Sequence, residues 1–367
     1  MGKEGRSRVV HVVVGGEIGG AERMLADLAS SEASGAEHTI AVLSPLDELV
    51  RLFERAGVRV VDRGRVREGP AHYLWRSLGP GDVAWLTDVM RSARADIAHL
   101  HTFGSQVLGT RAARRAGLRV LRTEHSTRVY DDPSCWPFSR WSLARADAAV
   151  AVSEYLRGVA TRRAPWATSK LRVVHNGVDV SRFAWVERLP RETFNFALVG
   201  RLEPRKGVDL ALHALAAVPD ARLAIVGDGD QRASLEGKAR ALGVAERVRF
   251  HGAERDVRGA LADADAMLCS SRSEGLGVAL LEGMATGLPV VGFSVGGVPE
   301  IVSDGVTGLL AASGDVDSLA ARMRDATRAK DRMRALGAEA RRSVVERFSV
   351  QAMCEGYARA YAEVLAR

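Results

Sequence analysis

The hydrophobic pattern along the 367-residue chain alternates between two kinds of segment. Short β-branched runs are followed by longer amphipathic runs rich in Ala and Arg, which is typical of βαβ units with a parallel sheet. In the first half, the runs expected as strands are residues 9–14, 39–43, 58–61, 97–101, 120–122 and 148–152. The alternation restarts with residues 194–199, 222–226, 248–250, 266–269 and 289–293. The pattern therefore predicts an α/β protein with two doubly wound, Rossmann-like domains.

A turn-forming cluster, His175-Asn176-Gly177-Val178-Asp179, separates the two series, and residues 183–191 after it show little periodicity. We expect an N-terminal domain over residues 1–182 and a C-terminal domain over residues 191–349. Residues 350–367 predict a helix that packs back on the N-terminal domain. The apolar face expected for this helix comprises Met353, Tyr357, Tyr361 and Leu365. Two such domains facing each other across a cleft would bind a ligand at the carboxyl ends of their strands.

Two cations follow the first strand of the second domain, in Gly200-Arg201-Leu202-Glu203-Pro204-Arg205-Lys206-Gly207. Arg201 and Lys206 would hold a diphosphate and stabilise its departure from a sugar. Lys206 is one of only five lysines in the chain, so composition alone explains it poorly. The alternative is a basic helix N-terminus without a ligand, which the helix dipole disfavours.

Two glutamates frame a glycine-rich segment, Glu274-Gly275-Leu276-Gly277 and, further on, Glu282. Glycines let backbone amides approach a ligand closely, and a carboxylate can accept hydrogen bonds from sugar or ribose hydroxyls. The alternative for Glu282 is a partner of the helix dipole or a surface ion pair, which its apolar neighbours make less comfortable.

The first half offers a second glycine cluster and several histidines. Gly19 and Gly20 belong to a cluster between the first strand and a helix, where backbone amides receive a phosphate or simply form a tight turn. His101 and His125 both end strands and would meet in the cleft; for His125, an acceptor contact and a capping role are both open. We expect His99 on the other face of its strand, in the core.

The spacing of Glu274 and Glu282 resembles the E-x7-E signature of glycosyltransferase family 4. Other motifs resemble those of the family in the same order, and the resemblance covers essentially the whole chain. They are Gly19-Gly20-Ala21-Glu22, His99-Leu100-His101-Thr102, Val152-Ser153-Glu154, Asn176-Gly177-Val178-Asp179, the Arg201 and Lys206 pair, Gly227-Asp228-Gly229 and Gly296-Gly297-Val298-Pro299-Glu300. One departure is Leu276, where the family often has Phe.

The resemblance implies a GT-B fold and a retaining enzyme that moves a hexosyl group from a nucleoside-diphosphate sugar to an acceptor hydroxyl. It places Arg201 and Lys206 on the diphosphate, Glu282 on the ribose, and Glu274 with the amides of Leu276 and Gly277 on the sugar. The remaining implied site residues are, on the donor side, Gly19, Gly20, Gly252 and Gly275; near the anomeric centre, His101; and on the acceptor side, Glu22 and His125.

Composition and charge indicate which partners and cofactors to expect. The net charge is +7, and residues 1–180 hold 26 basic against 20 acidic residues, which leaves about +1 for the rest. A basic first half would attract an anionic acceptor or anionic lipid, or it is simply a solvated surface. The three cysteines lack metal-ligand spacing, and the short Asp-x-Asp matches look accidental, so we expect neither a metal nor another cofactor. Interleaved aromatic residues are lacking, so we expect no nucleic-acid partner.

The acceptor has no readable code, and we expect a sugar, a lipid-linked molecule or a small molecule. Cell-surface polysaccharide or glycolipid assembly is favoured, with glycosylation of a small natural product, an epimerase or a phosphorylase of related fold as alternatives. Tryptophans of the first half would stack on sugars, touch a membrane or lie in the core; they are Trp75, Trp85, Trp136 and Trp141. Without a signal peptide or an apolar span, we expect a cytoplasmic protein, with peripheral association with the inner face of an anionic membrane as a further option.

Overall fold

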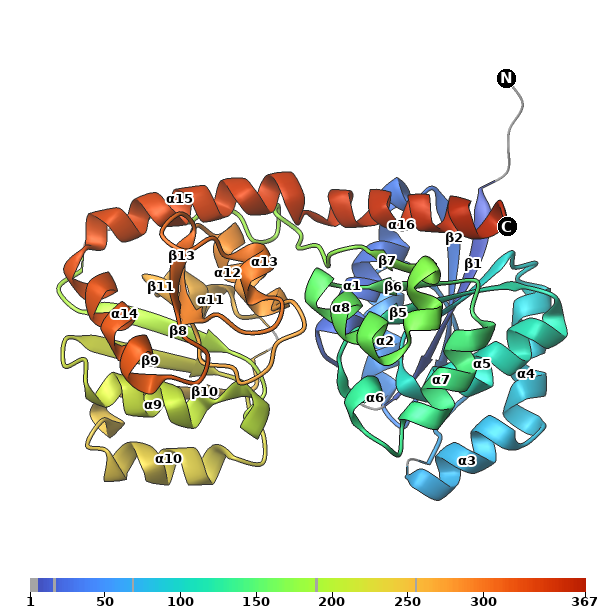
Figure 1. The fold of residues 1–367 in the computed structure, drawn as a ribbon, viewed down its shortest axis with the longest axis horizontal. Coiled ribbons are helices and arrows are strands. Elements are labelled where there is room, and N and C mark those ends of the chain that lie inside the picture. Colours follow the sequence, from blue (N-terminus) through green and yellow to red (C-terminus); the bar gives the residue numbers. More distant parts are fainter. Residues whose placement is uncertain (1–5, 16–17, 68, 189–190, 255) are drawn as a thin grey trace. The chain divides into compact units, whose positions relative to one another are not determined.

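The computed structural model describes residues 6–15, 18–67, 69–188, 191–254 and 256–367. Contacts divide the chain into two compact units (Figure 1): Met1–Asn176 with Val350–Arg367, and Gly177–Ser349. Residues 177–182, which we had assigned to the N-terminal domain, belong to the second unit. Val178 forms a bridge with Ser349, and the Arg341 guanidinium donates hydrogen bonds to the backbone carbonyls of Val180 and of Phe183, which directly follows this segment.

The first unit contains a seven-stranded sheet with the order β3-β2-β1-β4-β5-β6-β7. All neighbouring strands are parallel, as expected for strands connected by helical crossovers. The strands are β1 (Ser7–Val14), β2 (Ala36–Leu43), β3 (Arg59–Asp62), β4 (Ile97–Leu100), β5 (Arg119–Glu124), β6 (Ala148–Ala151) and β7 (Leu171–Val173).

Helices follow these strands in the manner that the amphipathic runs predict. They are α1 (Gly20–Ser30), α2 (Asp47–Arg55), α3 (Pro70–Leu78), α4 (Gly81–Ser92), α5 (Phe103–Ala116), α6 (Arg128–Asp131), α7 (Trp136–Arg145) and α8 (Glu154–Arg163), with 3-10 turns η1 (Glu32–Ser34) and η2 (Pro165–Lys170). Helix α5 ends at Ala116 and is followed by Gly117, whose φ of 76° is the left-handed conformation that glycine adopts at little cost.

The C-terminal helix α16 (Val350–Leu365) packs on the first unit, against α1, η1 and β5. Met353, Tyr357 and Tyr361 are buried in a core cluster with residues of β1, β4 and β5. The expectation for Leu365 is wrong, because its side chain is 42% exposed and Val364 is buried in its place. The last turn of the helix thus presents the neighbouring position to the core.

The second unit contains a six-stranded parallel sheet with the order β10-β9-β8-β11-β12-β13. Its strands are β8 (Phe194–Val199), β9 (Ala221–Val226), β10 (Val248–Gly252), β11 (Ala266–Cys269), β12 (Val290–Phe293) and β13 (Gly308–Ala311). Its helices are α9 (Val208–Ala216), α10 (Arg232–Ala241), α11 (Arg258–Ala262), α12 (Val278–Ala285), α13 (Val298–Ile301), α14 (Val316–Arg328) and α15 (Lys330–Arg347), with 3-10 turns η3 (Pro204–Lys206) and η4 (Ala245–Arg247).

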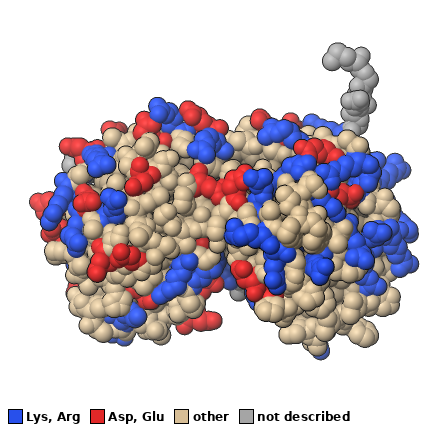
Figure 2. All heavy atoms as spheres, viewed as in Figure 1, with Lys and Arg blue, Asp and Glu red and all other residues tan. Residues whose placement is uncertain are grey.

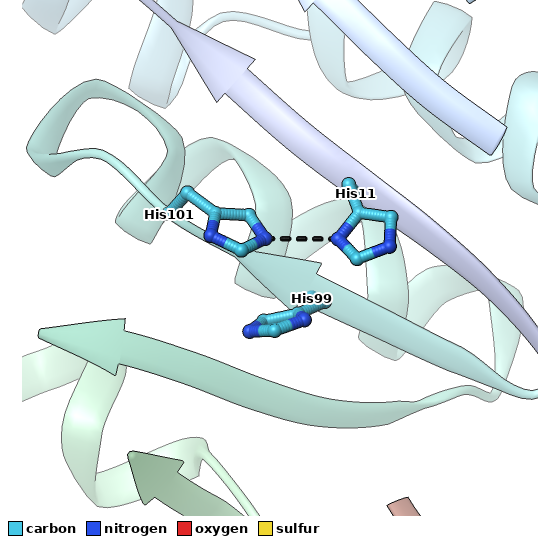
Figure 3. A group of neighbouring side chains, drawn as sticks. All are labelled: His11, His99 and His101. Atoms are coloured by element: carbon cyan, nitrogen blue, oxygen red, sulfur yellow. Dashed lines mark hydrogen bonds between the residues drawn. The ribbon is translucent and has the colours of Figure 1, made fainter. Parts of the chain in front are cut away.

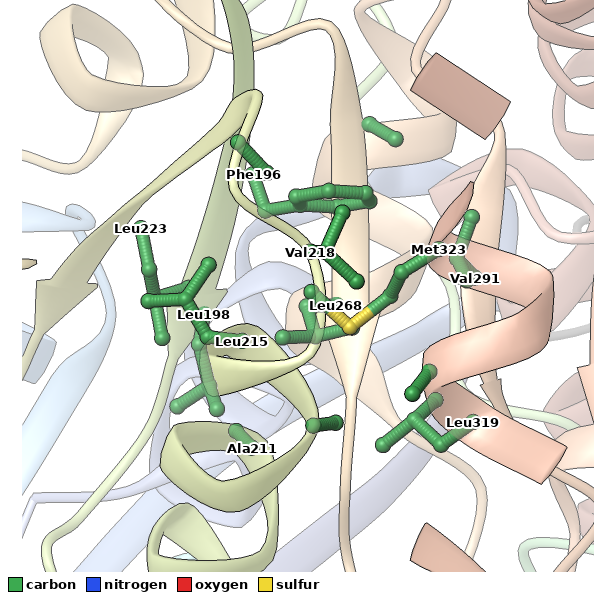
Figure 4. Packing of buried hydrophobic residues seen from close by; sticks show 14 of the residues in the cluster. Phe196, Leu198, Ala211, Leu215, Val218, Leu223, Leu268, Val291, Leu319 and Met323 are labelled. Carbon is green, nitrogen blue, oxygen red and sulfur yellow. The ribbon is translucent and has the colours of Figure 1, made fainter. Parts of the chain in front are cut away.

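The core of the second unit lies between its sheet and the helices α9 and α14 (Figure 4). Phe196, Leu198 and Leu268 project from β8 and β11 against Leu215 of α9 and Met323 of α14, and all five are almost fully buried. Burial of side chains of this size contributes about 1.5–3 kcal/mol each. The core therefore fixes the ends of β8 and β11, and the loops that follow these strands carry Arg201, Lys206 and Glu274.

Every run that the sequence predicted as a strand falls on a strand of the structure. The pattern missed β7 and β13, which form one edge of each sheet. Among the residues described, no helix has the length and apolar character needed to cross a bilayer.

Candidate functional site

Both sheets reverse their strand order at one point, and most of the predicted site residues follow the strands at these points. In the first sheet the order changes between β1 and β4, and in the second between β8 and β11. Ligands of open α/β sheets bind at such switch points, outside the carboxyl ends of the strands. His101 directly follows β4, Arg201 follows β8, and Glu274 follows β11.

In the second unit, the structure brings together two predicted residues that are far apart in the sequence. The Lys206 ammonium lies 2.6 Å from Glu274 Oε2, and both side chains are mostly buried. Ser271 Oγ donates a second hydrogen bond to the same carboxylate oxygen, at 3.3 Å. The stem of Lys206 lies over Gly200, where a Cβ would come within 3.3 Å of its Cε. Lys206 is thus held in a fixed direction, rather than free at the surface.

Around this ion pair, glycines allow loops to approach each other closely. Gly277 precedes α12 with a φ of 96°, a left-handed conformation. A Cβ on Gly297 would lie 2.2 Å from the Gly275 carbonyl oxygen, and the Gly297 N–H donates to the Glu274 carbonyl. The Glu274–Gly277 segment is therefore clamped at the start of α12, whose amides face a position suited to an anion.

The other predicted donor residues lie at different depths. Arg201 is exposed on the loop after β8, whereas Glu282 is 8% exposed inside α12. Leu276 is buried, so its side chain serves packing while its backbone stays on the loop. Gly252 ends β10 and accepts a hydrogen bond from the Gly227 N–H.

The first unit contains a pocket of about 770 Å³ at the end of β1, β4 and β5. Its walls combine apolar side chains, such as Leu74 and Phe138, with polar groups that include Gln106 and Glu124. Several buried polar atoms there lack a hydrogen-bond partner among the described residues; they are Tyr73 Oη, His101 Nδ1, Gln106 Oε1 and both ring nitrogens of His125. Unpaired buried polar atoms are costly, so this pocket offers hydrogen-bonding positions that a ligand with hydroxyl groups would satisfy.

Behind the pocket, β5 carries a buried ion pair that the sequence analysis missed. Arg122 Nη2 lies 2.7 Å from Glu124 Oε1, and both side chains are 1% exposed. The guanidinium also donates to the carbonyl and hydroxyl oxygens of Ser139. Glu124 lines the pocket and presents a neutralised carboxylate to it. The signal was in the sequence, because opposite charges two residues apart on one strand share a face.

The predicted residues of the first glycine cluster form the start of α1. Glu22 lines the pocket, and its Oε2 accepts a hydrogen bond from the Gly19 N–H at 2.9 Å. Gly20 begins the helix and is exposed. Gly16 and Glu17 of the same cluster lie outside the described residues. Glu22 therefore combines a capping role with a place at the pocket wall.

His101 belongs to a group of histidines around β1 (Figure 3). The rings of His99 and His101 lie 4.0 Å apart, so the expectation that His99 occupies the other strand face is wrong. Residues two apart in a strand point to the same side. Burial and neighbouring histidines lower the pKa values of His11, His99 and His101 well below 6.5. Burial lowers the pKa of His125 to about 4.

One nitrogen each of His11, His99 and His101 lies within 4.8 Å of the others, a spacing at which a metal ion could be held. Five of their six ring nitrogens are engaged in hydrogen bonds. The partners of His99 are Tyr361 at 3.0 Å and Thr123 at 2.7 Å, and those of His11 are other histidines. A metal would have to displace these bonds, so the geometry favours a hydrogen-bond network, and the absence of a metal stays a prediction.

Comparison with known families identifies both halves of the chain. Residues 18–182 match the family described as Glycosyltransferase Family 4, and residues 180–343 match Glycosyl transferases group 1. The chain is 31% identical over 342 residues to D-inositol 3-phosphate glycosyltransferase of Actinosynnema mirum, with 81% of each chain covered. The chain belongs to glycosyltransferase family 4. It is therefore an enzyme, a glycosyltransferase.

Two further relatives show the range of the family. A GDP-mannose-dependent alpha-(1-6)-phosphatidylinositol monomannoside mannosyltransferase of Mycolicibacterium smegmatis is 36% identical over 262 residues, which cover 64% of this chain and 68% of the relative. An N-acetyl-alpha-D-glucosaminyl L-malate synthase of Bacillus anthracis is 28% identical over 306 residues, or 76% and 78% of the two chains.

The solved structure of Anabaena Alr3699/HepE in complex with UDP and glucose has the same fold. It superposes with a TM-score of 0.83 and 22% identity, over 97% of this chain and 99% of the other. The expected GT-B fold, with two Rossmann-like parallel-sheet units, is thus confirmed.

Proposed function

We propose that this family 4 enzyme is a retaining hexosyltransferase that uses a nucleoside-diphosphate sugar and acts in cell-surface polysaccharide or glycolipid biosynthesis. The observation that carries the proposal is the Lys206–Glu274 pair at the switch point of the second unit. Lys206 and Arg201 hold the diphosphate, while Glu274 holds sugar hydroxyls and orients the Lys206 ammonium. Glu282 accepts the ribose hydroxyls.

The chemistry requires charge stabilisation more than an enzyme nucleophile. As the bond between sugar and diphosphate breaks, negative charge grows on the leaving phosphate, and preorganised cations and helix amides stabilise it. The acceptor hydroxyl then attacks the oxocarbenium-like sugar from the face that the diphosphate leaves, which retains the anomeric configuration. With these cations in place, the reaction needs neither a resident metal nor another cofactor.

The kinetic test is Lys206→Ala. The matched control is Lys238→Ala, because Lys238 lies in the last turn of α10 and not on a loop that follows a strand of the switch point. Loss of one group that stabilises transition-state charge lowers kcat by about 10²–10³. We expect that loss for Lys206→Ala at saturating donor, and turnover of the control close to wild type. Turnover of Lys206→Ala near wild type would contradict the diphosphate role.

For the acceptor, we propose a hydroxyl compound with an anionic group. The relatives are named for acceptors that include L-malate, inositol 3-phosphate and a phosphatidylinositol mannoside. On the face drawn in Figure 2, Lys and Arg side chains cover more of the first unit than Asp and Glu do, whereas the second unit shows mixed charges. Exposed Arg128 lines the pocket of the first unit and would contact the anion. We expect Arg128→Ala to raise KM for an anionic acceptor but not for a neutral analogue; equal changes would refute this contact.

A lipid-linked acceptor is the favoured member of this class, because α3 exposes an apolar surface beside the pocket. Leu74, Trp75 and Leu78 are 41%, 78% and 59% exposed, and Leu74 also lines the pocket. Of the three places that the sequence left open for Trp75, a sugar contact, a membrane contact and the core, its exposure excludes the core. Exposed Trp and Leu on one helix suit the membrane interface, which would place the enzyme peripherally on the cytoplasmic face of an anionic membrane.

The membrane contact is tested by flotation with vesicles of phosphatidylglycerol and phosphatidylcholine. Trp75→Ser is expected to reduce the bound fraction, whereas Trp166→Ser, at another exposed site of the first unit, is not. Equal binding of both variants would favour a small-molecule acceptor free in solution, the second candidate. Mass detection of products separates the remaining alternatives, since an epimerase converts the donor without an acceptor and a phosphorylase requires inorganic phosphate.

A further inference from the structure

A chain of hydrogen bonds connects His101, at the pocket of the first unit, to Ser34 across three neighbouring strands. His101 Nε2 lies 2.9 Å from His11 Nδ1, and His11 Nε2 lies 2.8 Å from His38 Nδ1. His38 Nε2 lies 2.7 Å from Ser34 Oγ. The three histidines come from the end of β4, from β1 and from β2, which are adjacent in the sheet. The first bond is drawn in Figure 3.

The far end of this chain fixes the direction of every bond in it. The Ser34 hydroxyl has a single proton, and its oxygen lies 3.0 Å from the Ser31 carbonyl, which can only accept. The Ser34 proton is therefore used on Ser31, and Ser34 Oγ must accept from His38. This places the proton of His38 on Nε2 and leaves its Nδ1 as an acceptor.

The same assignment passes along the chain, because each neutral imidazole has one donor and one acceptor nitrogen. His11 must donate from Nε2 to His38 Nδ1, which leaves His11 Nδ1 as an acceptor. His101 must then donate from Nε2, so its Nδ1 carries a lone pair. That nitrogen points away from His11 in Figure 3 and has no hydrogen-bond partner among the described residues.

The surroundings keep the chain neutral. Burial lowers the pKa of His38 to about 4, and burial with neighbouring histidines lowers the pKa values of His11 and His101 well below their usual range. The rings that pack against these three histidines are those of His99, His125 and Tyr361. The chain ends on a hydroxyl and a backbone carbonyl, in contrast to a triad in which a carboxylate stabilises an imidazolium.

We propose that His11 and His38 are positioning residues that hold His101 in its Nε2–H tautomer, so that His101 Nδ1 accepts a hydrogen bond from a substrate hydroxyl in the pocket. The inference rests on the proposed function in that the hydroxyl belongs to a substrate of the transfer. His101 therefore orients a hydroxyl as a neutral acceptor, rather than as a cation. Of the three histidines in this chain, sequence motifs indicated only His101. His11 and His38 are recognised only once the strand order places β1 and β2 beside β4.

The direct test needs no turnover. Long-range ¹H–¹⁵N spectra of the full-length protein labelled with ¹⁵N-histidine distinguish the two tautomers, and His101→Gln, His11→Asn and His38→Asn assign the signals. We expect the Nε2–H form for His101, His11 and His38 at pH 7.5. An Nδ1–H form, or an averaged mixture, for His101 would overturn the proposal even if the enzyme proves to be the expected transferase.

The functional test compares two substitutions at His38. Asn places a carbonyl oxygen near the position of Nδ1 and can still accept from His11, whereas Phe keeps the ring shape without an acceptor. Removing the hydrogen-bond partner that orients a functional histidine typically costs 10–100-fold where that histidine binds a metal, and we expect a drop of this order, about tenfold or more, in kcat for His38→Phe. His38→Asn should stay within about threefold of wild type, with the donor KM unchanged in both variants.

Equal kcat values for the two variants would contradict the relay. His213→Phe, at an exposed position of α9, controls for the loss of a histidine as such. If His38→Phe fails to fold, the wild-type tautomer spectra decide the question by themselves.

Discussion

Lowering the pH from 7.5 to 5.0 should destabilise the first unit more than the second. Five histidines of the first unit have pKa values below 6.5 in the folded protein: the buried His11, His38, His99 and His101, and the half-buried His125. The unfolded chain binds more protons at these sites, so the free energy of unfolding rises with pH. The stability is fully present above about pH 6.5 and is lost as the pH falls toward the folded pKa values.

The magnitude follows from the shifts. For His38 and His125, with pKa values of about 4 in the folded state and 6.5 in the unfolded state, the loss between pH 7.5 and pH 5.0 is about 2 kcal/mol each. The pKa values of His11, His99 and His101 are lowered as well, so these groups add to the loss in the same direction. Domains have stabilities of about 5–15 kcal/mol, so a loss of about 4 kcal/mol from His38 and His125 together is a large fraction of the stability of the unit.

Urea unfolding of the full chain at both pH values measures the loss, and hydrogen exchange with mass spectrometry assigns it to a unit. The second unit is the internal control, because its described histidines are exposed or only partly buried. His125→Leu should reduce the pH-dependent loss by about 2 kcal/mol, the contribution of one such group. Equal stability of the first unit at both pH values, or an equal loss in both units, would refute the reasoning.

Two substitutions test the packing behind the site. Arg122→Leu leaves the Glu124 carboxylate buried without its partner, and we expect the free energy of unfolding in urea to fall by about 3–5 kcal/mol. The control is Arg172→Leu, which removes the ion pair between Arg172 and Glu363 near the surface and should cost at most about 1 kcal/mol. Gly297→Ala places a Cβ against the Gly275 carbonyl and should weaken nucleotide-sugar binding, measured by calorimetry. Gly259→Ala, where a Cβ meets open space, serves as its control, and similar binding by both alanine variants would be evidence against the clamped loop.

The sequence predicted the strands that carry the site because each of them is a short apolar run bounded by polar or glycine-rich segments, as expected for buried parallel strands. It missed β7, which has only three residues, and β13, whose segment Gly308–Ala311 has no β-branched residue. Lys206 and Glu274 were both predicted from local motifs, but their ion pair depends on β8 and β11 being neighbours. Strand order is a long-range property, and local patterns do not encode it.

The histidine chain shows the same limit. His11 and His38 look like ordinary polar residues in two buried strands, and only the parallel register of β1 with β2 brings their rings together. The sequence placed His101 near the chemistry through a motif. The residues that orient the His101 ring could not be predicted from the sequence, because their contacts depend on which strands pair with each other.

The central claim is that the second unit binds a nucleoside-diphosphate sugar through Lys206 and Glu274. The most direct measurement is the thermal shift of the full chain with UDP-, GDP-, ADP- and dTDP-sugars, repeated on Lys206→Ala and Lys238→Ala. The account predicts that at least one donor raises the Tm of wild type and of Lys238→Ala, and that the shift is largely lost in Lys206→Ala. A shift by none of the donors, or a shift that survives unchanged in Lys206→Ala, would contradict it.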